Sequence, residues 1–325
     1  MTFSLDEIQA PIKEELKLFD GHFREAMKSK VPLLDKITYY IVKTKGKQFR
    51  PMICLLSAKL FGPVNDKTYA AATLVELLHT ATLVHDDVVD DADQRRGFFS
   101  INALWKNKIA VLVGDYLLSM GLLTALQRKH FDLLEILSTA VKEMSEGELL
   151  QVEKARRLDI SEEIYYQIIR QKTASLITAA CTCGAKSIDS VSAEQLQYMN
   201  SYGEFIGMAF QIKDDLMDLS PDWTGKPKIH DIKEKKMTLP LIKALAQAPG
   251  RLKRDIIDKI RKHSEDKNVV REVVKFIFDY DGVDQAEKVM IDYRDKALKI
   301  LEVLPQNDIN ETLRKLSFFV TERKK

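Results

Sequence analysis

The chain has 325 residues, 45% of them hydrophobic and 30% charged, so it is long enough to bury a large core. Lysines and arginines number 50 and aspartates and glutamates 48, which gives a net charge of +2. This balance excludes the strong overall field that attracts nucleic acid, so any electrostatic function must be local.

Targeting and redox features are sparse. The first residues, MTFSLDEIQAPIKEEL, lack the basic start and apolar centre of a signal peptide, and we see no apolar run of about 18 residues that would indicate a membrane span. Cys54, Cys181 and Cys183 have no zinc-type spacing and are typical of buried thiols in a reducing compartment. We therefore expect a cytoplasmic protein without a transmembrane segment.

Successive long helices are predicted along the chain. LLSAKLF ends before Gly62, and TYAAATLVELLHTATLVHDD follows Asn65–Asp66, a good N-cap signal. No proline occurs between Pro63 and Pro221, and Ser192-Ala-Glu-Gln195 is typical of a capping box. Alternating strand patterns and Asn-Gly turns are missing. The predicted fold class is all-α.

One stretch interrupts the helical pattern. Ser220 to Pro240 contains three prolines and a cluster of lysines, which indicates a surface loop. From about Arg251 onward we predict charged helices without a recognisable site, ending in TERKK, which we expect to be solvated. No repeat or low-complexity linker divides the chain, so we expect a single all-helical domain over residues 1–325.

Two copies of the pattern D-D-x-x-D end strongly apolar helices, LLHTATLVHDDVVDDAD and YGEFIGMAFQIKDDLMDL. Either copy alone could be a solvated acidic surface. Carboxylates at the end of an apolar helix also suit a cavity with metal at its mouth and an apolar ligand in its depth. Since Mg²⁺ binds through a few carboxylates plus substrate phosphates, we predict several Mg²⁺ ions and a diphosphate. The six aspartates are Asp86, Asp87, Asp90, Asp214, Asp215 and Asp218.

Basic residues near the first acidic cluster could hold phosphate groups. Lys47 and Arg50 precede a helix expected to begin at Pro51, and helix N-termini bind anions. Alone, KGKQFRP could equally be a solvated loop. Arg95–Arg96 follow the acidic cluster, and arginine suits bidentate phosphate contacts. His79 lies on the same helix face as that cluster, and the residues alone leave open whether it is a core residue or a phosphate ligand.

With these motifs the sequence resembles the trans-isoprenyl diphosphate synthases of the polyprenyl synthetase family, long-chain type. GKQFRP, LLHTATLVHDDVVDDADQRRG, KTASL, FQIKDDLMD, TGKP and KMTLP occur in the family's order and cover about residues 40 to 245. The resemblance implies a bundle of antiparallel helices around a deep central cavity, usually as a homodimer. It implies isopentenyl diphosphate and an allylic diphosphate as substrates and Mg²⁺ as cofactor, with about three ions when the diphosphate is bound.

The resemblance also implies a role for each matching residue. Asp86, Asp90, Asp214 and Asp218 are the foremost metal ligands within the two triplets, and Thr173 matches a position near the developing allylic cation. Residues matching catalytic positions are Lys172, Thr173 and Gln211. Residues matching positions that hold the allylic diphosphate are Arg95, Lys172, Thr173, Gln211, Lys226 and Lys236. Residues matching positions that hold isopentenyl diphosphate are Lys47, Arg50, His79 and Arg96.

The implied reaction needs no protein nucleophile. Diphosphate departs from the allylic substrate, the isopentenyl double bond attacks the resulting cation, and a proton is lost, most plausibly to the released diphosphate. One departure from the family concerns the loop before KMTLP, where Ile229 and Lys235 occupy places that are usually glycine. Glycine adopts positive φ readily whereas Ile and Lys tolerate it poorly, so this departure bears on the conformation of the loop.

Product length is predicted from the residues before Asp86. Ala81 and Thr82 lie about 6–7.5 Å deeper along the helix, where bulky aromatics stop elongation early in the family. Small residues there predict a long product of about six to eight isoprene units (C30–C40), as used for quinone side chains. A residue lower in the cavity could instead supply the floor. The candidates are Leu117, Met120, Leu123 and Phe131.

Three alternatives stay open: a shorter-chain (C15–C20) synthase, a class I terpene cyclase, and a noncatalytic partner subunit. A cyclase usually carries an Asn/Asp-Ser/Thr-Glu second motif, and a noncatalytic subunit could lose its acidic triplets. Both triplets are intact here, which favours elongation.

Overall fold

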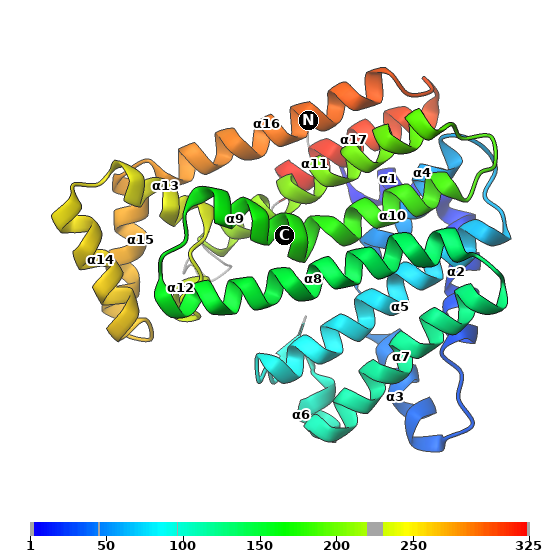
Figure 1. Ribbon diagram of the computed structural model, residues 1–325, viewed down its shortest axis with the longest axis horizontal. Coiled ribbons are helices and arrows are strands. Elements are labelled where there is room, and N and C mark those ends of the chain that lie inside the picture. The colour runs from blue at the N-terminus through cyan, green and yellow to red at the C-terminus, as the bar shows by residue number, and fades with distance from the viewer. Residues whose placement is uncertain (1–2, 45, 96, 220–229, 324–325) are drawn as a thin grey trace.

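The structure, a computed structural model, describes residues 3–44, 46–95, 97–219 and 230–323. The described chain is almost wholly helical, which confirms the all-α prediction (Figure 1). Its elements are α1 (Leu5–Gln9), η1 (Ala10–Ile12), α2 (Lys13–Ala26), α3 (Pro32–Lys43), α4 (Phe49–Lys59), α5 (Asp66–Val89), β1 (Gln94–Arg95), β2 (Phe98–Phe99), α6 (Ile101–Trp105), α7 (Asn107–Gln127), α8 (Phe131–Arg157), α9 (Glu162–Ile169), η2 (Arg170–Ala174), α10 (Ser175–Lys186), α11 (Ala193–Asp218), α12 (His230–Lys233), α13 (Leu239–Gln247), α14 (Gly250–His263), α15 (Lys267–Asp279), α16 (Gly282–Glu302) and α17 (Asp308–Glu322).

The core lies among α4, α5, α10 and α11. α10 packs against the other three and α4 packs against α5, and their buried side chains run around each helix rather than along one stripe, as expected for central helices. α7 and α8 cover one side and α16 lies along α11 (Figure 1). The capping boxes predicted at Asn65 and Ser192 are both present, so local capping sets where α5 and α11 begin.

Three local expectations were wrong. α4 begins at Phe49 rather than Pro51, with Gln48 at its N-cap in the left-handed region (φ 50°), so Arg50 lies inside the first turn. A two-residue antiparallel ladder pairs Gln94 with Phe99 directly after the first acidic motif, although no strand was predicted. The described part of TERKK is not solvated, since Thr321 is buried and the Arg323 side chain is only 13% exposed.

α7 also departs from expectation. Among the described residues it is the one helix long and apolar enough, by length and composition alone, to cross a membrane, with a mean hydropathy of 1.9. Its inner face packs on α5 and buries Leu117 and Gly121. Its outer face is apolar and exposed, and includes Leu112, Leu123 and Leu126.

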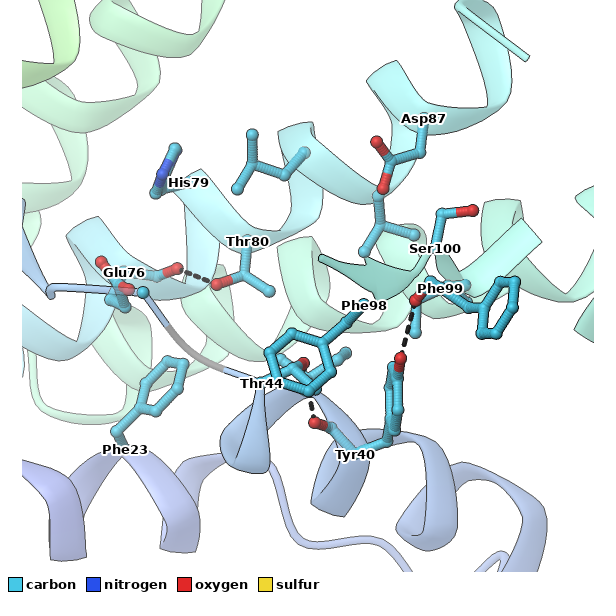
Figure 2. A pocket seen from close by; sticks show the side chains of 15 residues that line it. Phe23, Tyr40, Thr44, Glu76, His79, Thr80, Asp87, Phe98, Phe99 and Ser100 are labelled. Atoms are coloured by element: carbon cyan, nitrogen blue, oxygen red, sulfur yellow. Dashed lines mark hydrogen bonds between the residues drawn. The ribbon is translucent and has the colours of Figure 1, made fainter. Parts of the chain in front are cut away.

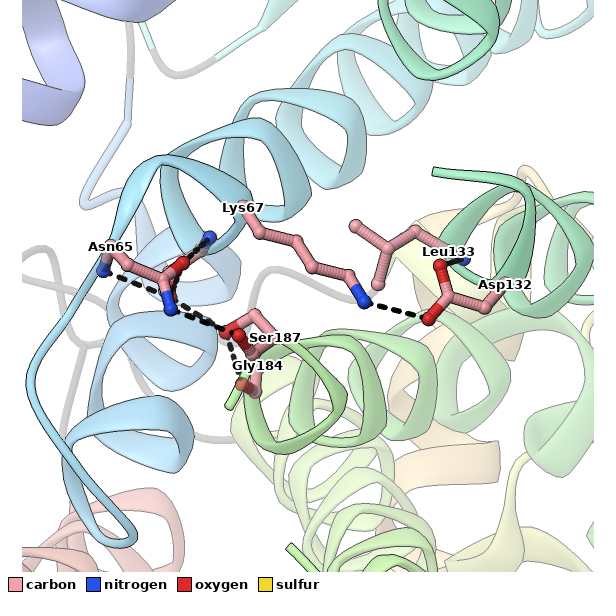
Figure 3. A network of polar contacts seen from close by, with 7 residues as sticks. Asn65, Lys67, Asp132, Leu133, Gly184 and Ser187 are labelled. Carbon is pink, nitrogen blue, oxygen red and sulfur yellow. Dashed lines mark hydrogen bonds and ion pairs between the residues drawn. The ribbon is translucent and has the colours of Figure 1, made fainter. Parts of the chain in front are cut away.

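A polar network ties the helices together at the end of α5 far from the acidic motif (Figure 3). Lys67 at the start of α5 donates to Asp132 at the start of α8 over 2.8 Å, and Asn65 donates to the carbonyl of Ser187, just after α10, over 3.0 Å. Burial opposes ionisation of Asp132, but the Lys67 ammonium and the Leu133 N–H outweigh it and lower the pKa of Asp132. This end is therefore closed by charged and polar contacts.

The three cysteines are buried and form no disulfide, which confirms the prediction of structural thiols. Burial raises the pKa of Cys181 to about 12, so its thiol is protonated at neutral pH and poorly nucleophilic.

Candidate active site

The ends of α5 and α11 contribute to two adjoining cavities. One cavity is lined by Asp90, Glu148, Arg156 and Lys236. The other, of about 590 Å³ including its open mouth, is lined by polar residues of η2, α11 and the segment around α12, together with apolar side chains of α9. Lys236 lines both cavities, with Asp90 of the first motif in one and Asp215 of the second motif in the other. The two acidic motifs therefore lie around one region of the molecule. The polar residues of the second cavity are Gln151, Tyr165, Lys172, Thr173, Gln211, Asp215, Asp231, Lys236 and Thr238.

The three aspartates of the first motif have different surroundings. Asp86 is half-buried on the last turn of α5, and Asp90 is the exposed C-cap, whose N–H donates to the Asp86 carbonyl over 2.8 Å. Asp87 is only 4% exposed and lines a different cavity beside the β1–β2 ladder. Asp86 and Asp90 are therefore the members one turn apart that can reach a ligand at the mouth.

In the second motif, Asp214 pairs with a residue that sequence reasoning missed. Arg323 Nη2 lies 2.6 Å from Asp214 Oδ1 and donates to the Phe210 carbonyl over 3.2 Å, with its guanidinium 3.9 Å above the Phe210 ring. Burial raises the pKa of Asp214, and Arg323 and Arg50 counteract that shift in part. The only sequence signal for this contact was an arginine ending an amphipathic helix.

The middle aspartate, Asp215, lies at the centre of a buried network. Its Oδ2 accepts from Tyr165 Oη at 2.7 Å, and its Oδ1 accepts from Gln211 Nε2 at 2.9 Å. Thr173 Oγ1 in turn donates to Gln211 Oε1 over 2.7 Å. Burial, with repulsion from Asp231, raises the pKa of Asp215 to about 7. Both oxygens of Asp215 are thus engaged by protein donors, whereas Asp218 accepts from the Asp231 N–H at 3.2 Å.

Two lysines contribute positive charge to the cavities. Lys172 lies on the π-helical turn η2 and pairs with Glu148 of α8. Lys236 pairs with Glu234; its burial disfavours the charged form, but Glu234, Asp231 and Asp90 together raise the pKa of Lys236. Both lysines are therefore held among carboxylates, close to where an anion would accompany metal ions.

Of the residues predicted to hold isopentenyl diphosphate, the structure describes Lys47 and Arg50 near the start of α4, and His79 on α5. Arg50 Nη1 is 2.9 Å from His79 Nε2, so the structure brings these two together, and Lys47 is exposed just before α4. His79 lines a cavity of about 670 Å³ with Glu76, Thr80 and Asp87 on α5, facing the aromatic side chains of the β1–β2 ladder (Figure 2).

Part of the predicted site lies outside the described residues. This applies to Arg96, Lys226 and Ile229, and to the side chain of Arg95, whose backbone belongs to β1. Lys235 is described, and it does adopt the left-handed region, with φ 58°. A lysine therefore takes the conformation for which the family's usual glycine is suited.

The candidate chain-length residues can now be placed. Ala81 is buried, and Thr82 Oγ1 donates to the His79 carbonyl over 2.9 Å. α7 runs antiparallel to α5, with Gly114 beside His85 and Gly121 beside Leu78. Leu117, midway between these glycines and fully buried, is therefore level with Ala81 and Thr82. Met120 is partly buried, whereas Leu123 and Phe131 are 45% and 59% exposed and do not line the interior of the chain.

The carboxylates of the two motifs fit Mg²⁺ ions that take some of their ligands from the protein and the others from a bound diphosphate. Among the described residues, no three His, Cys, Asp or Glu side chains come close enough to hold one ion. Asp86, Asp90 and Asp218 nevertheless offer accessible or half-buried hard oxygen atoms. Because Mg²⁺ keeps several waters and takes its other ligands from substrate phosphates, this arrangement suits Mg²⁺ that binds together with a diphosphate.

Comparisons with known proteins point to one family. Residues 31–277 match the family model described as polyprenyl synthetase. The chain is 35% identical, over 98% of its length and 97% of the relative's, to an all-trans-nonaprenyl-diphosphate synthase (geranyl-diphosphate specific) from Rhodobacter capsulatus. It is 32% identical, over 98% and 99%, to a short chain isoprenyl diphosphate synthase from Methanothermobacter thermautotrophicus. A crystal structure of polyprenyl synthase from Caulobacter crescentus CB15, complexed with calcium and isoprenyl diphosphate, superposes with a TM-score of 0.92 at 31% identity, covering 100% of this chain and 99% of that one.

Proposed function

This chain belongs to the polyprenyl synthetase family and is a prenyl transferase, and on that premise we propose that it condenses isopentenyl diphosphate with an allylic diphosphate to make a long all-trans polyprenyl diphosphate. The observation that carries the proposal is the pair of adjoining cavities, in which Asp90, Lys172 and Lys236 meet the network of Asp215. That combination suits a diphosphate held between metal ions and ammonium groups, with the hydrocarbon in the bundle.

We propose that the two acidic motifs bind about three Mg²⁺ ions together with the diphosphate. The proposed ligands are Asp86, Asp90, Asp214 and Asp218. Asp214 would break its ion pair with Arg323 when it binds the metal. Asp87 and Asp215, which the sequence grouped with them, are here proposed to act as supports because both are buried. The calcium and isoprenyl diphosphate in the similar Caulobacter structure support a divalent cation with this class of ligand.

For the two substrates we propose separate positions. Lys172, Thr173, Gln211 and Lys236, together with Arg95 and Lys226, would hold the allylic diphosphate. Lys47, Arg50, His79 and Arg96 would hold isopentenyl diphosphate. The contact between Arg50 and His79 supports the second group, and the cavity shared by Lys172, Thr173, Gln211 and Lys236 supports the first.

The proposed chemistry is electrostatic. Bound Mg²⁺ would supply charge to neutralise the departing diphosphate. Lys172 and Lys236 would hold its oxygens while the allylic C–O bond breaks, and the isopentenyl double bond would then form the new C–C bond before a proton passes to the released diphosphate. Ile168 and Ile169 in the same cavity would keep water from the cation.

Product length is proposed to be about six to eight isoprene units (C30–C40), with the shorter C15–C20 synthase as the alternative. Ala81 and Thr82 support the long product because neither side chain is bulky. Leu117 is the candidate floor, since it is fully buried at the level of Ala81.

We propose that the whole chain acts as one domain, as a cytoplasmic homodimer without a membrane-spanning segment. The ion pair between Arg323 and Asp214 supports a single domain, because it joins the segment just after α17 to the acidic motif on α11. The exposed Leu112, Leu123 and Leu126 on α7 support a second copy as the partner, since such a face is typical of an interface between subunits. Sedimentation of the purified chain tests the dimer, and a monomer would contradict it.

The deciding experiment is a product assay. The purified chain receives Mg²⁺, isopentenyl diphosphate and either farnesyl or geranylgeranyl diphosphate, and chain length is read after dephosphorylation. Products of C30 or longer are expected. Products that stop at C15–C20 would keep the reaction but contradict the length, and cyclic hydrocarbon or no turnover would favour a cyclase or a partner subunit.

The metal assignment has its own test. Replacing Asp86 and Asp90 together with Asn should abolish turnover without unfolding the protein, because both side chains reach solvent at the end of α5. The matched control is Asp93→Asn, three residues beyond the motif. Near-normal turnover in the double variant would contradict the assignment.

A further inference from the structure

Lys172 and Thr173 lie on a turn of unusual geometry. In η2 the Ser175 N–H donates to the Arg170 carbonyl, five residues back, which makes this a π-helical turn inserted between α9 and α10. Ser175 Oγ donates to the Gln171 carbonyl over 2.6 Å, so a side chain satisfies a carbonyl within the widened turn. Such turns are rare and frequently occur at functional sites.

On one side, α8 approaches this turn at Gly147. A Cβ atom at residue 147 would lie 2.8 Å from the Gln171 Cβ and 2.9 Å from the Lys172 backbone nitrogen, whereas ordinary contacts begin at about 3.4 Å. The next residue, Glu148, pairs with the Lys172 side chain. α8 can therefore come close enough to hold Lys172 through Glu148 only because residue 147 has no side chain.

On the other side, α11 repeats this arrangement at Gly207. A Cβ atom there would lie 2.6 Å from both the Cα and the Cβ of Ala174. Gln211, one helical turn further on the same face, accepts the hydrogen bond from Thr173. Each helix thus offers a glycine for close approach and a polar residue that holds one side chain of the turn.

We propose that Gly147 and Gly207 are positioning residues for prenyl transfer. They let α8 and α11 close on η2 from two sides, and the widened turn then directs the adjacent side chains of Lys172 and Thr173 into one cavity. Lys172 is held from α8 and Thr173 from α11. The inference rests on the proposed function and deepens it, because it concerns how the allylic diphosphate is held.

The test compares two glycine-to-alanine variants within helices. Gly147→Ala forces η2 to move, whereas Gly121→Ala is a matched control, because its Cβ would meet nothing closer than 3.6 Å. We expect Gly147→Ala to lower kcat by tenfold or more while KM for isopentenyl diphosphate changes by less than threefold. Gly121→Ala should stay within twofold in both. Retention of kcat in Gly147→Ala, or an equal loss in Gly121→Ala, would overturn the proposal.

Two further variants separate positioning from a general folding defect. Gly207→Ala should lower kcat to the same extent, because its Cβ would press on Ala174 from the α11 side of the turn. Adding Gln171→Gly to Gly147→Ala removes one of the overlaps, so kcat should recover at least threefold even though a further glycine weakens the helix. No recovery, or thermal unfolding that explains the entire loss, would contradict positioning.

Failure of the proposed function is distinguishable in the same experiments. If the wild-type chain shows no turnover, the proposed function fails, and the positioning inference is then tested by binding alone. Calorimetry with farnesyl diphosphate and Mg²⁺ should show affinity at least tenfold weaker for Gly147→Ala and unchanged for Gly121→Ala. Equal affinities in both variants would refute the inference.

Discussion

The buried network around Asp215 makes a quantitative prediction for Tyr165→Phe. The Tyr165 hydroxyl donates to Asp215 Oδ2 at 2.7 Å, and both residues are 4% exposed, so no solvent water replaces the lost donor. A hydrogen bond to a buried charged group contributes about 1.5–3 kcal/mol. At pH 8, where Asp215 is mostly a carboxylate, we expect the free energy of unfolding to fall by about 2 kcal/mol.

The same substitution should also affect catalysis. Asp215 orients Gln211, and Gln211 accepts a hydrogen bond from Thr173. Loss of the hydrogen bond from the Tyr165 hydroxyl should therefore make Asp215 more mobile, and with it Gln211 and Thr173. We expect kcat to fall by about tenfold, which corresponds to about 1.4 kcal/mol of transition-state free energy. Stability is measured by urea unfolding without Mg²⁺, and kcat by incorporation of isopentenyl diphosphate.

Tyr166→Phe is the matched control for this prediction. Its hydroxyl donates to Glu162 on the same helix, and that side chain is partly exposed, so water can replace the lost donor. We expect a loss below about 0.5 kcal/mol for the control. If Tyr165→Phe costs no more than Tyr166→Phe and leaves kcat unchanged, the network does not hold the cavity residues and the reasoning is refuted.

Three further predictions concern other parts of the chain. Asp132→Asn should lower the free energy of unfolding by up to about 1 kcal/mol at pH 7, because the ion pair with Lys67 is partly exposed. Since the folded pKa of Asp132 lies below its usual value, this contribution is present above about pH 4 and disappears as the pH falls through the lowered pKa; a cost that does not shrink as the pH is lowered in urea unfolding would contradict it. Ala81→Phe should shorten the product in the chain-length assay, and an unchanged length would mean that the floor lies elsewhere. Lys235→Gly should raise the free energy of unfolding by up to about 1 kcal/mol, because relief of a left-handed φ of 58°, roughly 1–2 kcal/mol, outweighs the roughly 0.5–1 kcal/mol entropic cost of glycine, and the lost bond to the Arg261 carbonyl is exposed; a lower urea midpoint would refute this.

Local signals in the sequence were enough to predict the helices, and to predict that two of them end in the acidic motifs. Asn65 and Ser192 cap α5 and α11 as predicted, and the apolar period of each helix continues to its aspartates. Such signals act within a few residues, so they can be recognised without knowing how the helices pack. For the same reason, the start of α4 was misjudged only slightly, by two residues from Pro51.

Residues four apart share a helix face, so the sequence could pair Asp86 with Asp90 and Asp214 with Asp218. It could not show which other side chains contact these carboxylates. Asp215 is withdrawn from the mouth by Tyr165, 50 residues away, and Asp214 meets Arg323, 109 residues away. Neither partner belongs to a local pattern.

What only the tertiary structure decided is how helices distant in the chain meet. The widened turn at Lys172 and Thr173 packs against both α8 and α11. It depends on the close approach of α8 at Gly147 and of α11 at Gly207. Helix periodicity is a property of one segment, whereas the distance between two backbones depends on the side chains of both. The sequence by itself therefore determined which chemistry this protein carries, and the packing of its helices decided which of those side chains face one cavity and which support it from behind.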